Sequence, residues 1–248
     1  MHNNRDEAKM RRWLVLATLI GLPATMTQAA MIPLAQSRTV LSFGNATTPE
    51  ESDSDGDQSA AADFGLFDDL VGHAARAGSA SSDGFASQKS TIKPGAVNAT
   101  LSADAFVGAF GIDDGADGGS SSHFDLEFAV DTPGRYKLYL SGSANNNGSA
   151  SLILTEEGGG VSTYWDTTFE SSRIEGFLLK PGDTYSISAI ASASGFLSGG
   201  GGSPDGQAGM SFTLRQVPEP ASIYLTCVLA ASCAAMVVGK SKPRVKAD

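Results

Sequence analysis

Residues 124–141 (FDLEFAVDTPGRYKLYLS) carry the strongest structural signal in the chain. Apolar side chains take every second position on both sides of a turn: Phe124, Leu126, Phe128 and Val130 before it, and Tyr136, Leu138 and Leu140 after it. A period of two places one face of a strand on a core and the other in water. Pro133 and Gly134 stand at the central positions of a type II turn. We therefore predict a β-hairpin in which the acidic outer face of the first strand pairs with the basic outer face of the second.

The same alternation recurs later in the chain, at Tyr185, Ile187 and Ala189 and again at Met210, Phe212 and Leu214. Pro181-Gly182 predicts a second type II turn. The sequence contains 29 glycines, and strong helix formers are sparse away from the termini. Short alternating strands with turn residues between them are typical of antiparallel sandwiches. We expect residues 64–216 to form an all-β domain, an antiparallel β-sandwich of jelly-roll-like kind.

The N-terminal 29 residues have the features of a secretory signal peptide. Four basic residues within the first twelve precede an apolar run at 13–22, and Ala29 and Ala30 supply a small-residue cleavage site. The apolar run is too short to span the ~30 Å hydrocarbon core of a bilayer. We expect export by the secretion machinery and cleavage by signal peptidase after Ala29 or Ala30.

Residues 30–63 are mostly polar and carry an acidic run with Asp53, Asp55 and Asp57 at alternate positions. Low hydrophobicity with net negative charge favours a flexible, low-complexity linker. Alternating carboxylates can also bind calcium, but Gln58 stands where an EF-hand loop needs glycine. We therefore predict an acidic linker with solvated carboxylates, and no metal site.

The chain has 27 acidic and 17 basic residues, for a formal net charge of −10, and eight of the basic residues lie in the two terminal segments. An acidic exported domain repels nucleic acid, so nucleic-acid binding is not expected. Cys227 and Cys233 both lie in the C-terminal apolar run. We interpret them as small apolar residues of a membrane span and expect no disulfide in the domain.

Three features follow one another at the C-terminus. The first is Val217-Pro218-Glu219-Pro220, and the second is an apolar run at 223–239, which as a helix is about 26 Å long and a minimal membrane span. Its large apolar residues are Ile223, Leu225, Val228, Leu229, Met236, Val237 and Val238. The third is a basic tail, which the positive-inside rule places in the cytoplasm: Lys240, Lys242, Arg244 and Lys246.

This order of parts, at residues 217–248, resembles the PEP-CTERM sorting signal of bacterial envelope proteins. The resemblance implies an exosortase-type membrane peptidase that recognises Pro-Glu-Pro and cleaves near it, and an association with exopolysaccharide or biofilm. The prolines push Val217 and Glu219 into extended conformations, which predicts an open, unpaired segment that a peptidase can grip. We expect a protein of the cell envelope or extracellular space that is first anchored in the cytoplasmic membrane. An uncleaved anchor that happens to contain Pro-Glu-Pro is the alternative.

Catalytic and metal-binding patterns are missing from the sequence of the expected domain. Its two histidines, His73 and His123, have no cysteine beside them and no metal-ligand spacing, and there is no Gly-x-Ser-x-Gly elbow. We therefore expect a non-enzymatic protein without cofactor. A carbohydrate-binding module is the alternative, with Tyr164 and Trp165 stacking on sugar rings of an exopolysaccharide. Packing of Trp165 in the core would exclude that site, and a secreted hydrolase with an unrecognised site is a third hypothesis.

Overall fold

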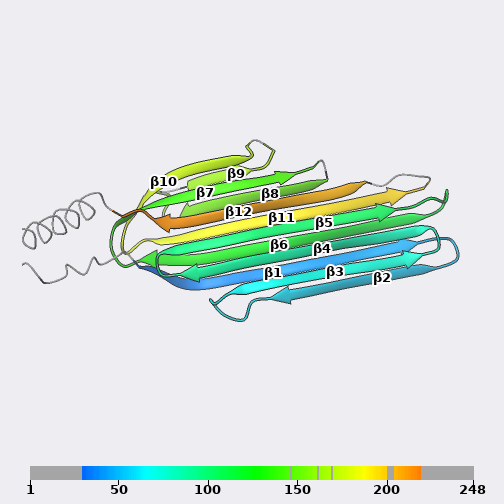
Figure 1. The fold of residues 1–248 in the computed structure, drawn as a ribbon, viewed down its shortest axis with the longest axis horizontal. Coiled ribbons are helices and arrows are strands. Elements are labelled where there is room, and N and C mark those ends of the chain that lie inside the picture. The colour runs from blue at the N-terminus through cyan, green and yellow to red at the C-terminus, as the bar shows by residue number, and fades with distance from the viewer. Residues whose placement is uncertain (1–29, 146, 161, 169, 200–203, 219–248) are drawn as a thin grey trace, which may run out of the picture.

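The computed structural model describes residues 30–218, apart from 146, 161, 169 and 200–203 (Figure 1). The described residues form twelve strands and no helix. The strands are β1 (Met31–Thr47), β2 (Ser52–Ala60), β3 (Phe67–Ala77), β4 (Ala80–Lys93), β5 (Ala96–Gly108), β6 (Gly115–Val130), β7 (Gly134–Ala144), β8 (Gly148–Glu156), β9 (Ser162–Asp166), β10 (Ser172–Leu179), β11 (Thr184–Ser198) and β12 (Asp205–Gln216). The prediction of an all-β, antiparallel fold is confirmed.

The termini cannot be compared with their predictions in the same way. The signal peptide at 1–29, the apolar run at 223–239 and the basic tail all lie outside the described residues. No helix among the residues that the structure describes is long and apolar enough to cross a bilayer.

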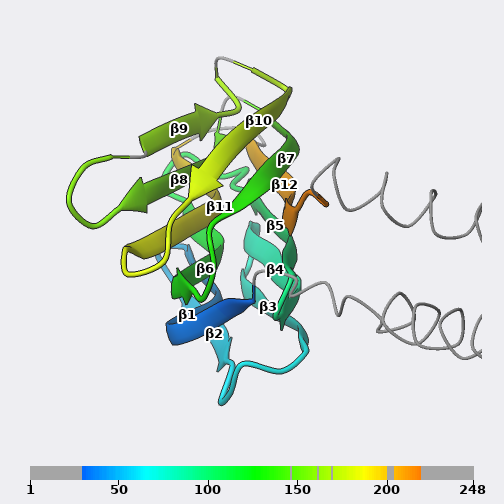
Figure 2. The same cartoon turned by 90° about the vertical axis from the view of Figure 1, so that its left-hand side faces the viewer.

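Two six-stranded antiparallel sheets pack face to face (Figure 2). Sheet A has the strand order β2-β1-β6-β11-β8-β9, and sheet B has the order β10-β7-β12-β5-β4-β3. The predicted inner faces are confirmed, because the apolar residues of β6, β7, β11 and β12 are buried between the sheets. Gly182 has a φ of 90°, as a type II turn after Pro181 requires.

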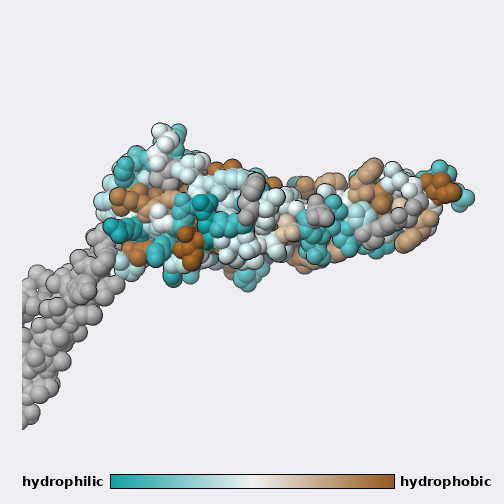
Figure 3. Space-filling view, turned by 90° about the horizontal axis from the view of Figure 1, so that it is seen from above, coloured by the Kyte–Doolittle hydropathy of each residue, from teal (hydrophilic) through white to brown (hydrophobic). Residues whose placement is uncertain are grey.

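The side chains that fill the space between the two sheets are large at one end of the strands and small at the other. Towards the end where the chain enters and leaves, here called the proximal end, large side chains fill it, and the rings of Phe124 and Phe212 meet edge to face at 5.2 Å. Towards the opposite, distal end the interior consists mainly of alanine, serine and glycine. A Cβ on Gly44 would lie 2.4 Å from the His73 ring, so glycine lets the sheets approach there. The body accordingly tapers towards the distal end (Figure 3).

The predicted hairpin at 124–141 is wrong. β6 pairs with β1 and β11 in sheet A, whereas β7 pairs with β10 and β12 in sheet B, so the turn at 131–133 crosses from one sheet to the other. Gly134 is not among the glycines with positive φ, so the predicted type II turn does not form there. The acidic face of β6 and the basic face of β7 therefore lie on opposite outer surfaces of the molecule.

The predicted linker at 30–63 is also wrong where β1 and β2 form. β1 pairs with β6 along its length and buries residues such as Met31 and Val40. Arg38 is buried as well, and its guanidinium donates to Ser90 Oγ (3.2 Å) and to the carbonyl of Gly65 (2.8 Å). These bonds tie the segment after β2 to sheet B. The acidic run thus belongs to the folded body.

Candidate functional site

Both ends of the described chain lie at the proximal end, next to the turn between β6 and β7 (Figure 1). The backbone N–H of Ala30 donates to Asp131 Oδ1 at 2.7 Å. The N–H of Val217 donates to the carbonyl of Arg135, also at 2.7 Å. Of the predicted signal-cleavage residues, Ala30 is therefore half-buried at this turn, whereas Ala29 lies outside the described residues.

The first two residues of the sorting motif form part of a groove at this end. Val217 and Pro218 line it together with residues of β7 and β10: Arg135, Tyr136, Lys137, Gly176, Phe177 and Leu178. The groove measures about 510 Å³, and Val217 is half-buried while Pro218 is exposed. The prediction of an unpaired segment is wrong at Val217, because its N–H continues the pairing of β12 with β7. Glu219, Pro220 and the rest of the cassette lie outside the described residues.

The proposed glycan contact at Tyr164 and Trp165 does not hold for the tryptophan. Trp165 is only 2% exposed and belongs to the main core cluster, while Tyr164 is 52% exposed. Adjacent residues of a strand point to opposite faces, so β9 turns the two rings apart. The Tyr164 hydroxyl donates to Asp166 Oδ2 at 2.8 Å on the outer surface. A single exposed tyrosine remains where the sequence suggested a two-ring platform.

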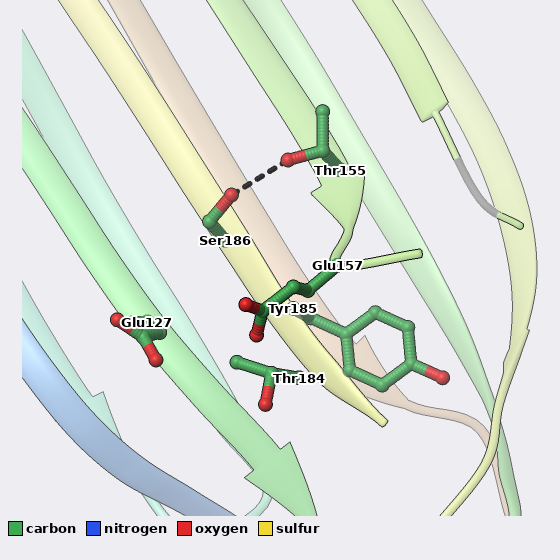
Figure 4. Close-up of a pocket in the computed structure, with 6 residues that line it drawn as sticks. All are labelled: Glu127, Thr155, Glu157, Thr184, Tyr185 and Ser186. Carbon is green, nitrogen blue, oxygen red and sulfur yellow. Dashed lines mark hydrogen bonds between the residues drawn. The ribbon is translucent and has the colours of Figure 1, made fainter. Parts of the chain in front are cut away.

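A shallow hollow on the outer face of sheet A contains two carboxylates (Figure 4). Glu127 and Glu157 lie on either side of it, with hydroxyls from β8 and β11 nearby, and Thr155 and Ser186 are hydrogen bonded to each other at 2.6 Å. The ring of Tyr185 points away from these hydroxyls. At about 290 Å³ the hollow is at the lower limit of ordinary ligand pockets. No group of three or more metal-ligating side chains occurs within the described part of the chain.

The interior of the distal half holds a chain of hydrogen bonds that sequence analysis did not find. Ser42 Oγ lies 2.6 Å from His73 Nδ1 and 2.8 Å from Ser120 Oγ, and His73 Nε2 lies 3.0 Å from Ser82 Oγ. Ser82 donates to the carbonyl of Asp117 at 2.9 Å. Ser82 must therefore accept from Nε2–H of His73, and in a neutral ring Nδ1 then accepts from Ser42.

This serine–histidine arrangement is structural. Ser42 is 0% exposed and His73 is 5% exposed, so no substrate can reach the hydroxyl. Burial lowers the pKa of His73, which favours the neutral ring. The sequence signals this network only through small residues at alternate positions of four distant strands. That pattern does not indicate which strands face each other.

His123 and Asp125 form a histidine–carboxylate pair. His123 lies within β6 on the outer face of sheet A, and its Nε2 is 3.2 Å from Asp125 Oδ2. The hydrogen bond to Asp125 raises the pKa of His123. Both side chains are about 40% exposed, so the pair belongs to the surface.

Comparisons with known proteins do not assign the chain to a family. No protein-family model matches the chain, and no curated protein matches it. Among solved structures, the chain is similar to the crystal structure of a GH31 α-xylosidase from Xanthomonas citri, with 8% identity. The alignment covers 76% of this chain and 38% of that chain, at a TM-score of 0.20. A likeness this low carries no argument about function.

Proposed function

We propose that the chain is an exported, non-enzymatic protein of the bacterial cell envelope, sorted through a C-terminal PEP-CTERM signal. A signal peptide directs it out of the cytoplasm, the segment at 223–239 holds it in the membrane, and an exosortase recognises Pro-Glu-Pro and processes it. The mature β body then works in the envelope or extracellular matrix, in association with exopolysaccharide or biofilm.

The position of the two chain ends carries this proposal. Ala30 bonds to Asp131 in the turn between β6 and β7, and Val217 bonds to Arg135 near the start of β7. Both predicted targeting segments therefore leave the β body at the proximal end. A single membrane anchor after Val217 would hold the body by that end and point the distal end away from the bilayer. Pro218 is exposed there, within reach of a peptidase in the same membrane.

The finer form of the fold is part of the proposal. Seven of the eleven connections between the described strands pass from one sheet to the other, as the strand orders show. Such repeated crossing supports a jelly-roll-like sandwich. Glycan stacking on the pair Tyr164 and Trp165 is not proposed, because Trp165 is buried.

Reporter fusions in a bacterial host test the export and orientation. Alkaline phosphatase, which is active only outside the cytoplasm, should be active when fused after Gln216 and inactive when fused after Asp248. Deleting the apolar run at 13–22 should silence the first fusion and serves as the control. Activity at both positions, or at neither with the chain expressed, would contradict the proposed anchoring.

A further inference from the structure

Basic residues are distributed unevenly over the described body. Residues 30–218 contain nine Lys and Arg against 23 Asp and Glu. Arg38 is buried, and three others form ion pairs with carboxylates: Arg76, Lys89 and Arg173. The remaining five are exposed and form no ion pair with any described residue: Lys93, Arg135, Lys137, Lys180 and Arg215. All five lie at strand ends of the proximal end, and we call them the basic surface.

The strand register brings four of these cations together on the outer face of sheet B. Arg215 is the cross-strand partner of Lys137, and Arg135 precedes Lys137 by two residues on the same face. Ala96 of β5 pairs with Lys93 of β4 on one side and with Arg215 of β12 on the other. Like charges directly opposite each other destabilise a sheet, and a bound anion relieves that cost. A strongly acidic body thus keeps four cations without ion-pair partners among the described residues on the outer face of sheet B.

The geometry of Arg215 keeps its charge at the surface. Its guanidinium lies 4.8 Å from the ring centroid of Tyr139 and donates to the Tyr139 hydroxyl at 3.0 Å. The same hydrogen bond lowers the pKa of Tyr139. The nearby carboxylate of Asp131 is occupied by the N–H of Ala30 and the hydroxyl of Thr132.

Exposed aliphatic side chains accompany the cations. Ile174 is 68% exposed and pairs with Tyr139, and Leu178 is 56% exposed and pairs with Arg135. Seen from above, hydrophobic and hydrophilic side chains alternate over this end of the body (Figure 3). Cations next to exposed aliphatics suit the interface of an anionic membrane, where headgroups meet acyl chains.

We propose that the basic surface, with Ile174 and Leu178, docks on anionic phospholipid headgroups. The inference rests on the proposed function only for the presence of a bilayer at this end. Ile223 lies six positions after Val217, a reach of about 20 Å at most, so the start of the predicted span and the basic surface lie close together. Docking therefore fixes how the body stands on the membrane before processing.

The test uses the full chain with Cys227 and Cys233 changed to serine and an environment-sensitive fluorophore on Ile174→Cys. The protein is reconstituted with phosphatidylglycerol or phosphatidylcholine vesicles, floated on a density gradient, and read for a blue shift and for quenching by nitroxide lipids. A label on Ile153→Cys, on the outer face of sheet A, is the matched control. We expect a shift for Ile174→Cys alone, in phosphatidylglycerol alone, and its loss at 1 M salt.

Charge variants identify the residues responsible. The triple variant Arg135→Gln, Lys137→Gln and Arg215→Gln should lower the docked population about fivefold for each cation removed, which reduces the shift to the phosphatidylcholine level. The control variant changes net charge by the same amount on the outer face of sheet A, through Ser37→Asp, Ser194→Asp and Ser198→Asp, and should keep the shift.

The outcomes separate this inference from the proposed function. Flotation in both lipids without a shift at Ile174→Cys overturns docking and leaves the membrane anchor intact. Flotation in phosphatidylglycerol alone, lost in the triple variant, supports docking and contradicts the anchor. Flotation in neither lipid contradicts both. A shift caused by a soluble acidic polysaccharide, with no difference between the lipids, overturns docking in favour of a glycan ligand.

Discussion

His73 connects the two sheets where their other inward side chains are mostly alanine, serine and glycine. Its ring bridges Ser42 of β1 and Ser82 of β4, and Ser42 continues the chain of bonds to Ser120 of β6. Each of these polar groups is buried and therefore needs a partner. The histidine gives Ser42 and Ser82 hydrogen-bond partners in this narrow interior. Burial favours the neutral form of the ring in this arrangement.

The stability of the fold should therefore depend on pH through His73. Burial lowers the pKa of His73 below its ordinary value of 6.5. Between 6.5 and the folded-state pKa, His73 is therefore protonated in the unfolded chain but neutral in the folded chain. The free energy of unfolding should fall as the pH drops from about 6.5 towards the folded-state pKa. His73→Gln should flatten that fall. Denaturant unfolding, followed by fluorescence of the buried Trp165, measures it.

His123 gives an internal control with the opposite sign. Asp125 raises the pKa of His123, so this residue adds stability below its unfolded pKa that is lost as the pH rises through the folded pKa. His123→Gln should therefore remove a loss of stability that occurs as the pH rises above about 6.5, and should leave the fall below pH 6.5 unchanged. Equal pH slopes for the wild type and His73→Gln would contradict the account of the buried network.

At the scale of elements, the acidic strand β2 links the edge of sheet A to the edge of sheet B. Its backbone pairs only with β1, in sheet A. Two of its carboxylates reach β3 of sheet B, where Asp55 Oδ2 accepts from the N–H of Ala74 and Asp53 Oδ2 from the N–H of Arg76, each at 2.8 Å. Edge strands expose unpaired amides that invite association with other chains, and charged side chains prevent this.

Removing these two carboxylates should weaken the edge. Asp53→Ala with Asp55→Ala should lower the free energy of unfolding by about 1 kcal/mol, which is below the usual range for charge-assisted hydrogen bonds because the site is exposed. It should also promote dimers, measured by light scattering. Asp57→Ala is the matched control, since the Asp57 carboxylate bonds only to the adjacent N–H of Gln58. An equal loss in the control would refute the role of these carboxylates in linking the two edges.

The sequence predicted the faces of the strands but not their partners. Alternation reports which side chains point inward, and Phe124, Leu126 and Phe128 are buried as expected. It does not report which strand lies alongside, so the nearest neighbour in sequence was taken as the partner. The acidic run was interpreted as a linker for a related reason. The amides that its carboxylates bind belong to β3, and nothing in the local composition points to them.

At the scale of the whole molecule, the body is polarised from end to end. The proximal end has the large core, both chain ends and the basic surface, while the distal end is narrow and filled by small side chains. The sorting motif could be found from sequence because its residues are contiguous. The basic surface could not, because Lys93 and Arg215 are brought together only by the strand register.

This difference between the two ends agrees with the proposal that the body is anchored to the membrane at its proximal end and then released by processing. Processing after docking would leave the β body without its basic tail. The sorting claim is therefore open to a direct measurement of the mature chain.

Intact-mass spectrometry of the envelope-associated protein, from cells with and without exosortase, is that measurement. In both strains the chain should begin at Ala30 or Met31. With exosortase it should end close to the Pro-Glu-Pro motif, and without exosortase it should still end at Asp248. A chain that ends at Asp248 in both strains would contradict the account.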